Sequence, residues 1–344
     1  MNNEVPSTTY VPTAADAGSR LDAYLAGQID GWSRTRLQRL IDDGDVLVNE
    51  RESKPSYKLR DGDVVEVELT ELPTTHFEPE NILLDIVYED EYLAVINKSA
   101  GMVVHPGAGV TSGTLANAIA YHFSPQRRGD AENTSQESSP PYKGGVDAAS
   151  ADGVVLSNRI GIVHRLDKDT SGLIVVAKDE RTAEELSRQF HDREVEKSYI
   201  ALVHGSPEQN SGKIDAAIAR NKHNRLRMKV APTGRSALSL WKVKQRFDKF
   251  TLLDVEIKTG RTHQIRVHLA SINHPVVGDA IYNEGRDNTI ADQPIKKAVE
   301  KLGRFFLHAE RLAFTHPKTR ERLEFKQQMP TELAGFLVVL DDSR

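Results

Sequence analysis

A proline-containing segment, Thr70–Asn81, divides this chain of 344 residues into two parts with different hydrophobic patterns. Before it, apolar residues recur at helical spacing over 20–41, and two short strand patterns follow, Val46–Asn49 and Val64–Leu69, the second with alternating apolar and charged residues. Beyond it, short strand patterns with hairpin-like spacing outnumber helical ones. We therefore expect an α+β protein: a module of two helices and a β-ribbon over residues 18–69, a linker over 70–81, and a larger domain over 82–344 on a mixed, mainly antiparallel sheet.

Two further segments lack periodicity. Residues 1–17 carry Pro6 and Pro12 and are expected to form a flexible tail. Residues 124–157 are rich in Ser, Gly, Pro and acids, which predicts a disordered insertion. In the larger domain the periodicity predicts helices at Thr114–Phe123, Thr182–Asp192, Thr262–Ile272 and Pro330–Val339.

Composition limits the class of protein. The chain has no cysteine, which excludes disulfide frameworks, thiol nucleophiles and iron–sulfur clusters. No apolar run approaches the roughly 18 residues that span a bilayer, and the N-terminus lacks the features of a signal peptide, so a cytoplasmic protein without membrane contact is expected. The net charge of −5, from 45 basic and 50 acidic residues, argues on average against a nucleic-acid partner. Local charge, however, is uneven.

A polar loop, His164–Gly172, lies between two apolar β-patterns. A polar loop fixed between buried strands is a common place for reactive groups. The alternative is an ordinary charged turn in which Asp167 or Asp169 accepts hydrogen bonds from backbone amides.

A second polar segment, Lys258–His268, follows a predicted strand that ends at Gly260. A helix starting with Thr262 as its N-cap would expose free amides beside Arg261, which favours a phosphate site. The two histidines of this segment are five positions apart and do not share a helical face, so no metal site is expected.

Two segments are locally basic. Ala219–Arg235 contains six Lys or Arg and no acid, and Ser33–Leu40 carries three arginines. Such runs are commonly solvated faces, but they can also contact a phosphate backbone.

Together these motifs resemble the RluA-type family of RNA pseudouridine synthases. His164–Gly172 is similar to the family's signature loop, Gly260–His268 to a second motif, and Lys197-Ser198-Tyr199 to its tyrosine motif. Residues 18–69 resemble an S4 RNA-binding domain. The resemblance covers about residues 18–123 and 159–340, and it implies a pseudouridine synthase catalytic domain over 82–344.

The resemblance also implies roles for single residues. Asp167 would be the catalytic carboxylate, and Arg266 would lie against it and favour its charged form. Tyr199 would stack on the target uracil and help to remove the C5 proton, while Ile265 packs on the other face. Arg165 would fill the place of the flipped nucleotide. Further RNA contacts are expected from Arg261, Arg34, Arg36 and Arg39.

The implied function is isomerisation of uridines in 23S large-subunit ribosomal RNA, by a monomer that needs neither metal nor cofactor. Whether Asp167 attacks C1′ or stabilises a glycal route is left open. One alternative is a non-catalytic RNA-binding or ribosome-assembly protein of the same fold. A metal-dependent nuclease using His164, Asp167 and Asp169 is disfavoured because the sequence offers no clustered set of metal ligands.

Overall fold

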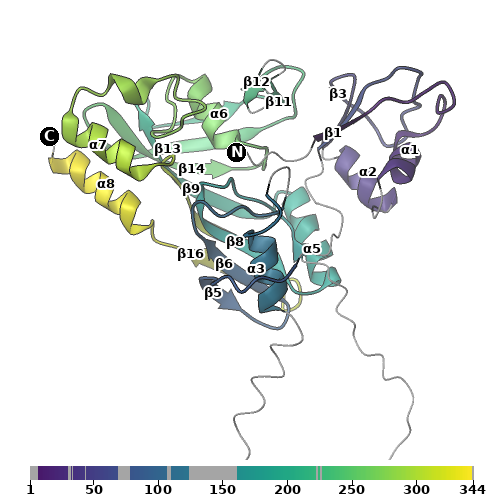
Figure 1. Ribbon diagram of the computed structural model, residues 1–344, viewed down its shortest axis with the longest axis horizontal. Helices are drawn as coiled ribbons and strands as arrows, with labels where there is room; N and C mark the ends of the chain where they lie inside the picture. Colours follow the sequence, from purple (N-terminus) through teal and green to yellow (C-terminus); the bar gives the residue numbers. More distant parts are fainter. Residues whose placement is uncertain are drawn as a thin grey trace, which may run out of the picture.

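The computed structural model describes residues 7–342 except 30, 31, 33, 43, 69–77, 107–109, 124–160, 222, 223, 225 and 226. These residues form two modules with separate hydrophobic cores, an N-terminal module (7–68) and a C-terminal module (78–342) (Figure 1). The predicted insertion at 124–157 and most of the predicted linker lie outside the described residues. Among the described helices, none is long and apolar enough to cross a membrane.

The N-terminal module packs two helices on a four-stranded antiparallel sheet of order β1-β4-β2-β3. Leucines at helical spacing, such as Leu21, Leu25 and Leu37, are fully buried against the strand valines. The predicted pair of helices and β-ribbon is therefore present. The elements are α1 (Leu21–Gln28), α2 (Arg34–Asp42), β1 (Ser7–Tyr10), β2 (Val46–Val48), β3 (Arg51–Glu52) and β4 (Val65–Glu68).

Part of the predicted flexible tail is ordered. Residues 7–10 form β1, which pairs with β4 so that Tyr10 lies opposite Val65. β-branched and aromatic side chains favour this conformation, and the strand covers an edge of β4 that would otherwise expose unpaired backbone groups. The tail prediction is wrong for these four residues because a local pattern does not show where an edge strand finds its partner.

The C-terminal module is built on one long sheet of order β10-β13-β14-β9-β15-β8-β6-β5, with β16 beside β15 and β7 beside β8. Only β8 and β15 run parallel among the described pairs of this sheet, so the predicted mixed, mainly antiparallel sheet is confirmed. The strands are β5 (Ile86–Glu89), β6 (Leu93–Lys98), β7 (Gly161–Ile162), β8 (Ser171–Ala177), β9 (Glu196–His204), β10 (Ser211–Asp215), β13 (Leu238–Arg246), β14 (Phe250–Ile257), β15 (Leu307–Thr315) and β16 (Arg322–Lys326), with a separate hairpin of β11 (Ile218–Arg220) and β12 (Met228–Val230).

Helices cover the sheet at separate places. In Figure 1, α3 and α5 accompany the β5–β6–β8 end, while α7 and α8 pack together at the other end. All four predicted helices are present, and α7 and a 3₁₀ turn, η2, are additional. The bounds are α3 (Leu115–His122), α5 (Glu180–His191), α6 (Gln264–Ser271), α7 (Gln293–Leu302), α8 (Thr331–Asp342) and η2 (Arg286–Thr289).

The start of α6 differs from the sequence prediction. Its N-cap is His263 in a left-handed conformation, φ 55°, with no side-chain cap, and Thr262 lies outside the helix. The Gln264 side chain instead accepts hydrogen bonds from the Arg261 amide at 3.0 Å and from the Thr259 hydroxyl at 2.7 Å. The Gln264 side chain, inside the helix, thus accepts from hydrogen-bond donors of the preceding turn. The Thr262 hydroxyl is not used as a cap and can bind another partner.

Gly172 makes the parallel contact between β8 and β15 possible. Its φ is +115°, and a Cβ at this position would lie 2.3 Å from the Ala309 carbonyl oxygen. A larger residue would push the two strands apart and would also be strained in this backbone conformation. The strand that follows the polar loop is therefore fixed against β15 by the absence of a side chain.

We predict that Gly172→Ala lowers the free energy of unfolding by at least about 2 kcal/mol, because strain and a backbone clash add. Gly303→Ala is the matched control: its φ is also positive, +64°, but a Cβ there meets nothing within 4 Å among the described residues. The control should cost only about 1 kcal/mol. Urea unfolding of both variants tests the difference, and equal losses would show that the close approach to Ala309 is unimportant.

Candidate active site

A pocket opens where the β7–β8 loop, β9 and the segment before α6 meet. All six residues that the sequence placed in the C-terminal part of the site line it: Arg165, Asp167, Tyr199, Arg261, Ile265 and Arg266. The remaining lining residues are Leu166, Thr170, Ile257, Gly260, Thr262, His263, Gln264 and Leu307. Segments about 100 residues apart in sequence thus line one pocket. Ligand-binding sites are generally concave in this way.

Two buried basic side chains hold the loop that carries Asp167. Lys98, a residue that is only 1% exposed, donates through Nζ to the carbonyl oxygens of Ser99, Met102 and Lys168 at 2.8, 2.9 and 2.9 Å. At the next residue of the loop, the Arg304 guanidinium donates to the Asp169 carbonyl at 2.9 Å. Backbone fixed at two adjacent carbonyls keeps a functional side chain in one geometry.

Asp167 is paired with Arg266, which is itself fixed by a second carboxylate. Arg266 donates to Asp167 Oδ2 at 3.1 Å and to both oxygens of Asp279 at 2.7 and 2.9 Å. The Phe305 ring lies 4.1 Å from the guanidinium carbon, and Asp279 also accepts hydrogen bonds from the backbone amides of Ile281 and Tyr282. The guanidinium therefore has a fixed orientation and presents one nitrogen to Asp167.

The surroundings keep Asp167 ionised. Burial alone would raise the pKa of its carboxyl, but the neighbouring charges of His263, Arg266 and Arg165 outweigh burial and lower the pKa. Burial lowers the pKa of His263 itself. Arg266 also donates a hydrogen bond to Asp167, which favours its carboxylate form further.

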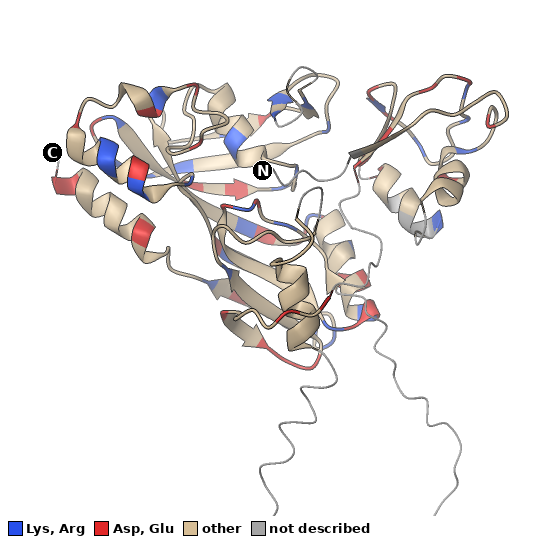
Figure 2. Ribbon diagram, in the orientation of Figure 1, with Lys and Arg blue, Asp and Glu red and all other residues tan. Residues whose placement is uncertain are grey.

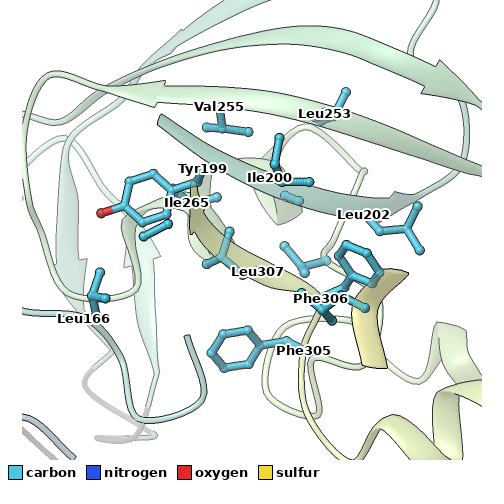
Figure 3. Packing of buried hydrophobic residues seen from close by; sticks show 14 of the residues in the cluster. Leu166, Tyr199, Ile200, Leu202, Leu253, Val255, Ile265, Phe305, Phe306 and Leu307 are labelled. Atoms are coloured by element: carbon cyan, nitrogen blue, oxygen red, sulfur yellow. The ribbon is translucent and has the colours of Figure 1, made fainter. Parts of the chain in front are cut away.

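An apolar wall faces the carboxylate. Figure 3 shows the Tyr199 ring beside Ile265, with its hydroxyl directed away from Phe306 and toward the side where Leu166 lies. Tyr199 is only 6% exposed, and burial, with the nearby Asp167 charge, raises the pKa of its phenol. A planar ring could pack against these side chains, next to an ionised oxygen.

The predicted RNA-binding arginines have different environments. Arg165 Nε is buried without a hydrogen-bond partner among the described residues. Arg261 donates to Asp45 of the N-terminal module at 3.3 Å. Arg34 pairs with Asp22 inside its own module at 3.1 Å, while half of its side chain stays exposed. Arg36 and Arg39 belong to α2, but their side chains lie outside the described residues.

His164, a candidate ligand in the nuclease alternative, has a structural role. Its Nε2 accepts a hydrogen bond from the Val175 amide at 3.0 Å, and its ring stacks on Phe190 with centroids 4.5 Å apart. Within the described part of the chain, His, Asp and Glu side chains do not gather in groups of three or more that could hold a metal ion. The donor set of the pocket therefore offers no support for the nuclease alternative.

Sequence reasoning missed four supporting residues of this site: Lys98, Asp279, Tyr282 and Arg304. The Tyr282 hydroxyl lies 2.8 Å from His263 Nδ1 and so supports the start of α6. Asp279 follows Gly278, eleven positions beyond the end of the motif Gly260–His268. A buried acid needs a cation, so its pairing with Arg266 could have been proposed from the sequence, but not its geometry.

Known proteins are similar to this chain over more than nine-tenths of its length. The family model described as RNA pseudouridylate synthase matches residues 92–271, and the S4 domain model matches residues 19–65. An RNA pseudouridine synthase of Bacillus subtilis, YlyB, is 38% identical, over 92% of this chain and 93% of that protein. Ribosomal large subunit pseudouridine synthase D of Neisseria meningitidis serogroup B is 40% identical, over 94% of this chain and 79% of that protein.

Solved structures support the same fold. Human RNA pseudouridylate synthase domain containing 4 has a TM-score of 0.54 at 22% identity, covering 74% of this chain and 92% of that chain. Human RNA pseudouridylate synthase domain containing 1 has a TM-score of 0.51 at 24% identity, covering 75% and 89%. At these identities the likeness concerns the fold alone. The resemblance inferred from the sequence motifs, and the S4 assignment of the N-terminal module, are confirmed.

We predict that His164 makes the stability of the fold sensitive to acid. Burial, with the nearby Lys197 charge, lowers the pKa of His164 to about 3, whereas an unfolded histidine titrates near 6.5. As the pH falls from about 6.5 toward 3, the unfolded chain gains a proton that the folded chain does not. Stability should therefore fall by up to about 1.4 kcal/mol per pH unit.

Urea unfolding across this pH range tests the histidine prediction. His164→Gln retains a hydrogen-bond acceptor for the Val175 amide but does not titrate, so its stability should depend less steeply on pH. His191→Gln, on the exposed part of α5, is the control and should retain the slope of the unchanged protein. Parallel curves for all three proteins would refute the assignment.

Proposed function

The chain belongs to the RNA pseudouridine synthase family of isomerases, and on this premise we propose that it converts uridines of 23S large-subunit ribosomal RNA to pseudouridine, with Asp167 as the catalytic carboxylate. The choice of RNA is supported by 40% identity to a ribosomal large subunit pseudouridine synthase D over 94% of the chain. The observation that carries the choice of residue is the ionised Asp167, paired with Arg266 in a pocket beside an apolar wall.

The reaction is an internal rearrangement of the nucleoside. The bond between N1 and C1′ breaks, the uracil turns, C5 bonds to C1′, and the proton lost from C5 is balanced by one gained at N1. Asp167 can attack C1′ or assist a glycal route, and both require a charged oxygen next to the sugar. Because Arg266 is held in place by Asp279, it can keep that oxygen charged and aimed throughout.

Tyr199 and Ile265 would hold the uracil between them. The raised pKa of Tyr199 keeps its phenol protonated at neutral pH. It would therefore act as a neutral stacking and hydrogen-bonding group during removal of the C5 proton, and not as a phenolate base. Of the two roles expected from the sequence, stacking on the uracil is therefore kept, and the help in removing the C5 proton is limited to hydrogen bonding.

Arg165 would replace the flipped nucleotide in the RNA stack. A uridine inside a stem must leave the helix before its N1–C1′ bond can reach a carboxylate. The Arg165 Nε has no partner among the described residues, so RNA could supply one. A non-catalytic RNA-binding protein of the same fold would have no use for an ionised carboxylate in this pocket, which favours the enzyme.

We predict that Asp167→Asn abolishes pseudouridine formation, by at least about 1,000-fold in rate, because an amide cannot supply the charged oxygen. RNA affinity should not fall, since a carboxylate repels phosphate and its replacement by an amide removes that repulsion. Asp169→Asn is the matched control and should remain active, because Asp169 contributes its backbone carbonyl to the loop anchor. Carbodiimide primer extension measures the product; pseudouridine from the Asp167 variant would contradict the assignment.

The choice of substrate has its own test. Pseudouridine maps of ribosomal RNA are compared between cells with and without this protein. We expect specific positions of 23S RNA to revert to uridine when the protein is absent and to return when the unchanged gene, but not the Asp167→Asn form, is restored. Identical 23S maps, or loss of pseudouridine only from other RNAs, would overturn the proposed substrate.

A further inference from the structure

The N-terminal module contacts the C-terminal module through an acidic pair. Asp45, just before β2, accepts hydrogen bonds from Arg235 at 2.7 Å and from Arg261 at 3.3 Å. Glu68, the last residue of β4, accepts one from Arg235 at 2.9 Å and one from the Thr262 hydroxyl at 2.6 Å. Two carboxylates of one module thus meet two guanidinium groups and a hydroxyl of the other.

This contact is buried and lies at the rim of the candidate active site. Asp45, Glu68 and Arg235 are 4%, 8% and 7% exposed. Arg261 and Thr262, on the opposite side of the contact, line the pocket that contains Asp167. The acidic pair therefore covers groups that belong to the site itself.

The charges around Glu68 are those expected to hold RNA. Burial would raise the pKa of its carboxyl, but Arg235, the Thr262 hydroxyl, Arg220 and Arg165 together lower it to about 2. Glu68 is consequently ionised, and its field reaches Arg165, the group expected to enter the RNA stack. Figure 2 shows acidic and basic residues on both modules, so neither module is a uniformly basic RNA surface.

Carboxylate and phosphate oxygens compete for the same guanidinium hydrogens. A buried ion pair contributes little net stability, because desolvation of its charges offsets much of their attraction. An RNA backbone that reaches Arg235 and Arg261 could therefore take the place of Asp45 and Glu68. A short RNA would have to open the contact using its binding energy at the pocket alone.

We propose that Asp45 and Glu68 are specificity-determining residues that keep the N-terminal module over the rim of the pocket until an RNA that also binds this module displaces them. The inference rests on the proposed function. It assigns the S4 module two tasks, binding RNA and excluding RNAs that it does not bind. If the contact served only to orient the module for catalysis, breaking it would lower activity on every RNA instead of improving activity on a short one.

Kinetics of the full chain distinguish the two possibilities. The double variant Asp45→Asn with Glu68→Gln keeps hydrogen-bond acceptors but removes both charges. On a short stem-loop RNA that carries a uridine identified by the maps, its KM should fall about 5-fold or more with kcat unchanged. On intact 23S RNA the variant and the unchanged protein should differ much less, because that RNA opens the contact in both.

The control removes the same two charges elsewhere in the module. Asp61→Asn with Glu66→Gln changes the turn before β4 and a residue within β4. If this control lowers KM as much as the first variant, general repulsion explains the effect and the inference fails. It also fails if the first variant loses activity on both RNAs.

A distance measurement tests the contact directly. Because the chain has no cysteine, spin labels can be attached at Lys54→Cys and Glu208→Cys, two exposed positions on different modules. The labelled protein should give one narrow distance that broadens in the Asp45→Asn, Glu68→Gln background or when 23S RNA is added. An unchanged distribution in both cases would refute the inference.

The outcomes also separate the inference from the proposed function. If the unchanged protein forms pseudouridine but the double variant gains nothing on the short RNA, only the inference is wrong. If the unchanged protein forms no pseudouridine in any RNA, the proposed function is wrong, and the inference that rests on it falls as well.

Discussion

The need to pair a largely buried carboxylate organises this protein. Asp167 lies in a pocket where burial opposes its charge, and the Arg266 guanidinium 3.1 Å away offsets that cost. Arg266 is buried too and needs the bidentate contact with Asp279. Three segments, the β7–β8 loop, α6 and the turn after it, must therefore meet around one cation. Loss of Arg266 would leave the carboxylates of Asp167 and Asp279 without this shared partner, so the site and the fold depend on the same contact.

The sheet supplies the geometry that this pairing requires. β8 continues directly from the Asp167 loop and runs parallel to β15, with Gly172 against Ala309. β9 pairs with the other edge of β15, which brings Tyr199 opposite Ala309. The carboxylate and the aromatic wall are thus placed by β8 and β9, the strands on either side of β15 in one sheet. A site built on strands and a doubly anchored loop holds its groups more accurately than one built on free loops.

The sequence was informative where chemistry is local. The polar loop between two apolar segments predicted a candidate site, and the family resemblance singled out Asp167 within it. Hydrophobic periodicity predicted both modules and their helices other than α7 among those described. It missed α7, whose signals are an N-cap at Asp292 and a proline in the first turn. Least predictable was Arg235: its basic neighbours suggested an exposed face, yet it is buried against Asp45, 190 residues away in the chain. A run of basic residues in the sequence does not show which of them will be buried against an acid of another module.

The contact of Asp45 and Glu68 with the two arginines also changes what the net charge of −5 implies about RNA binding. An acidic total argues against RNA only if the acids are free to repel phosphate, but Asp45 and Glu68 act as internal counterions of Arg235 and Arg261. When RNA binds to a bare basic surface, it releases bound salt ions, and affinity falls steeply with salt concentration. Where phosphate replaces a carboxylate of the same chain, no salt ion leaves that position. If RNA displaces Asp45 and Glu68 as proposed, its binding should depend less on salt than the number of cations at this contact suggests. The contact should then form again when the product leaves.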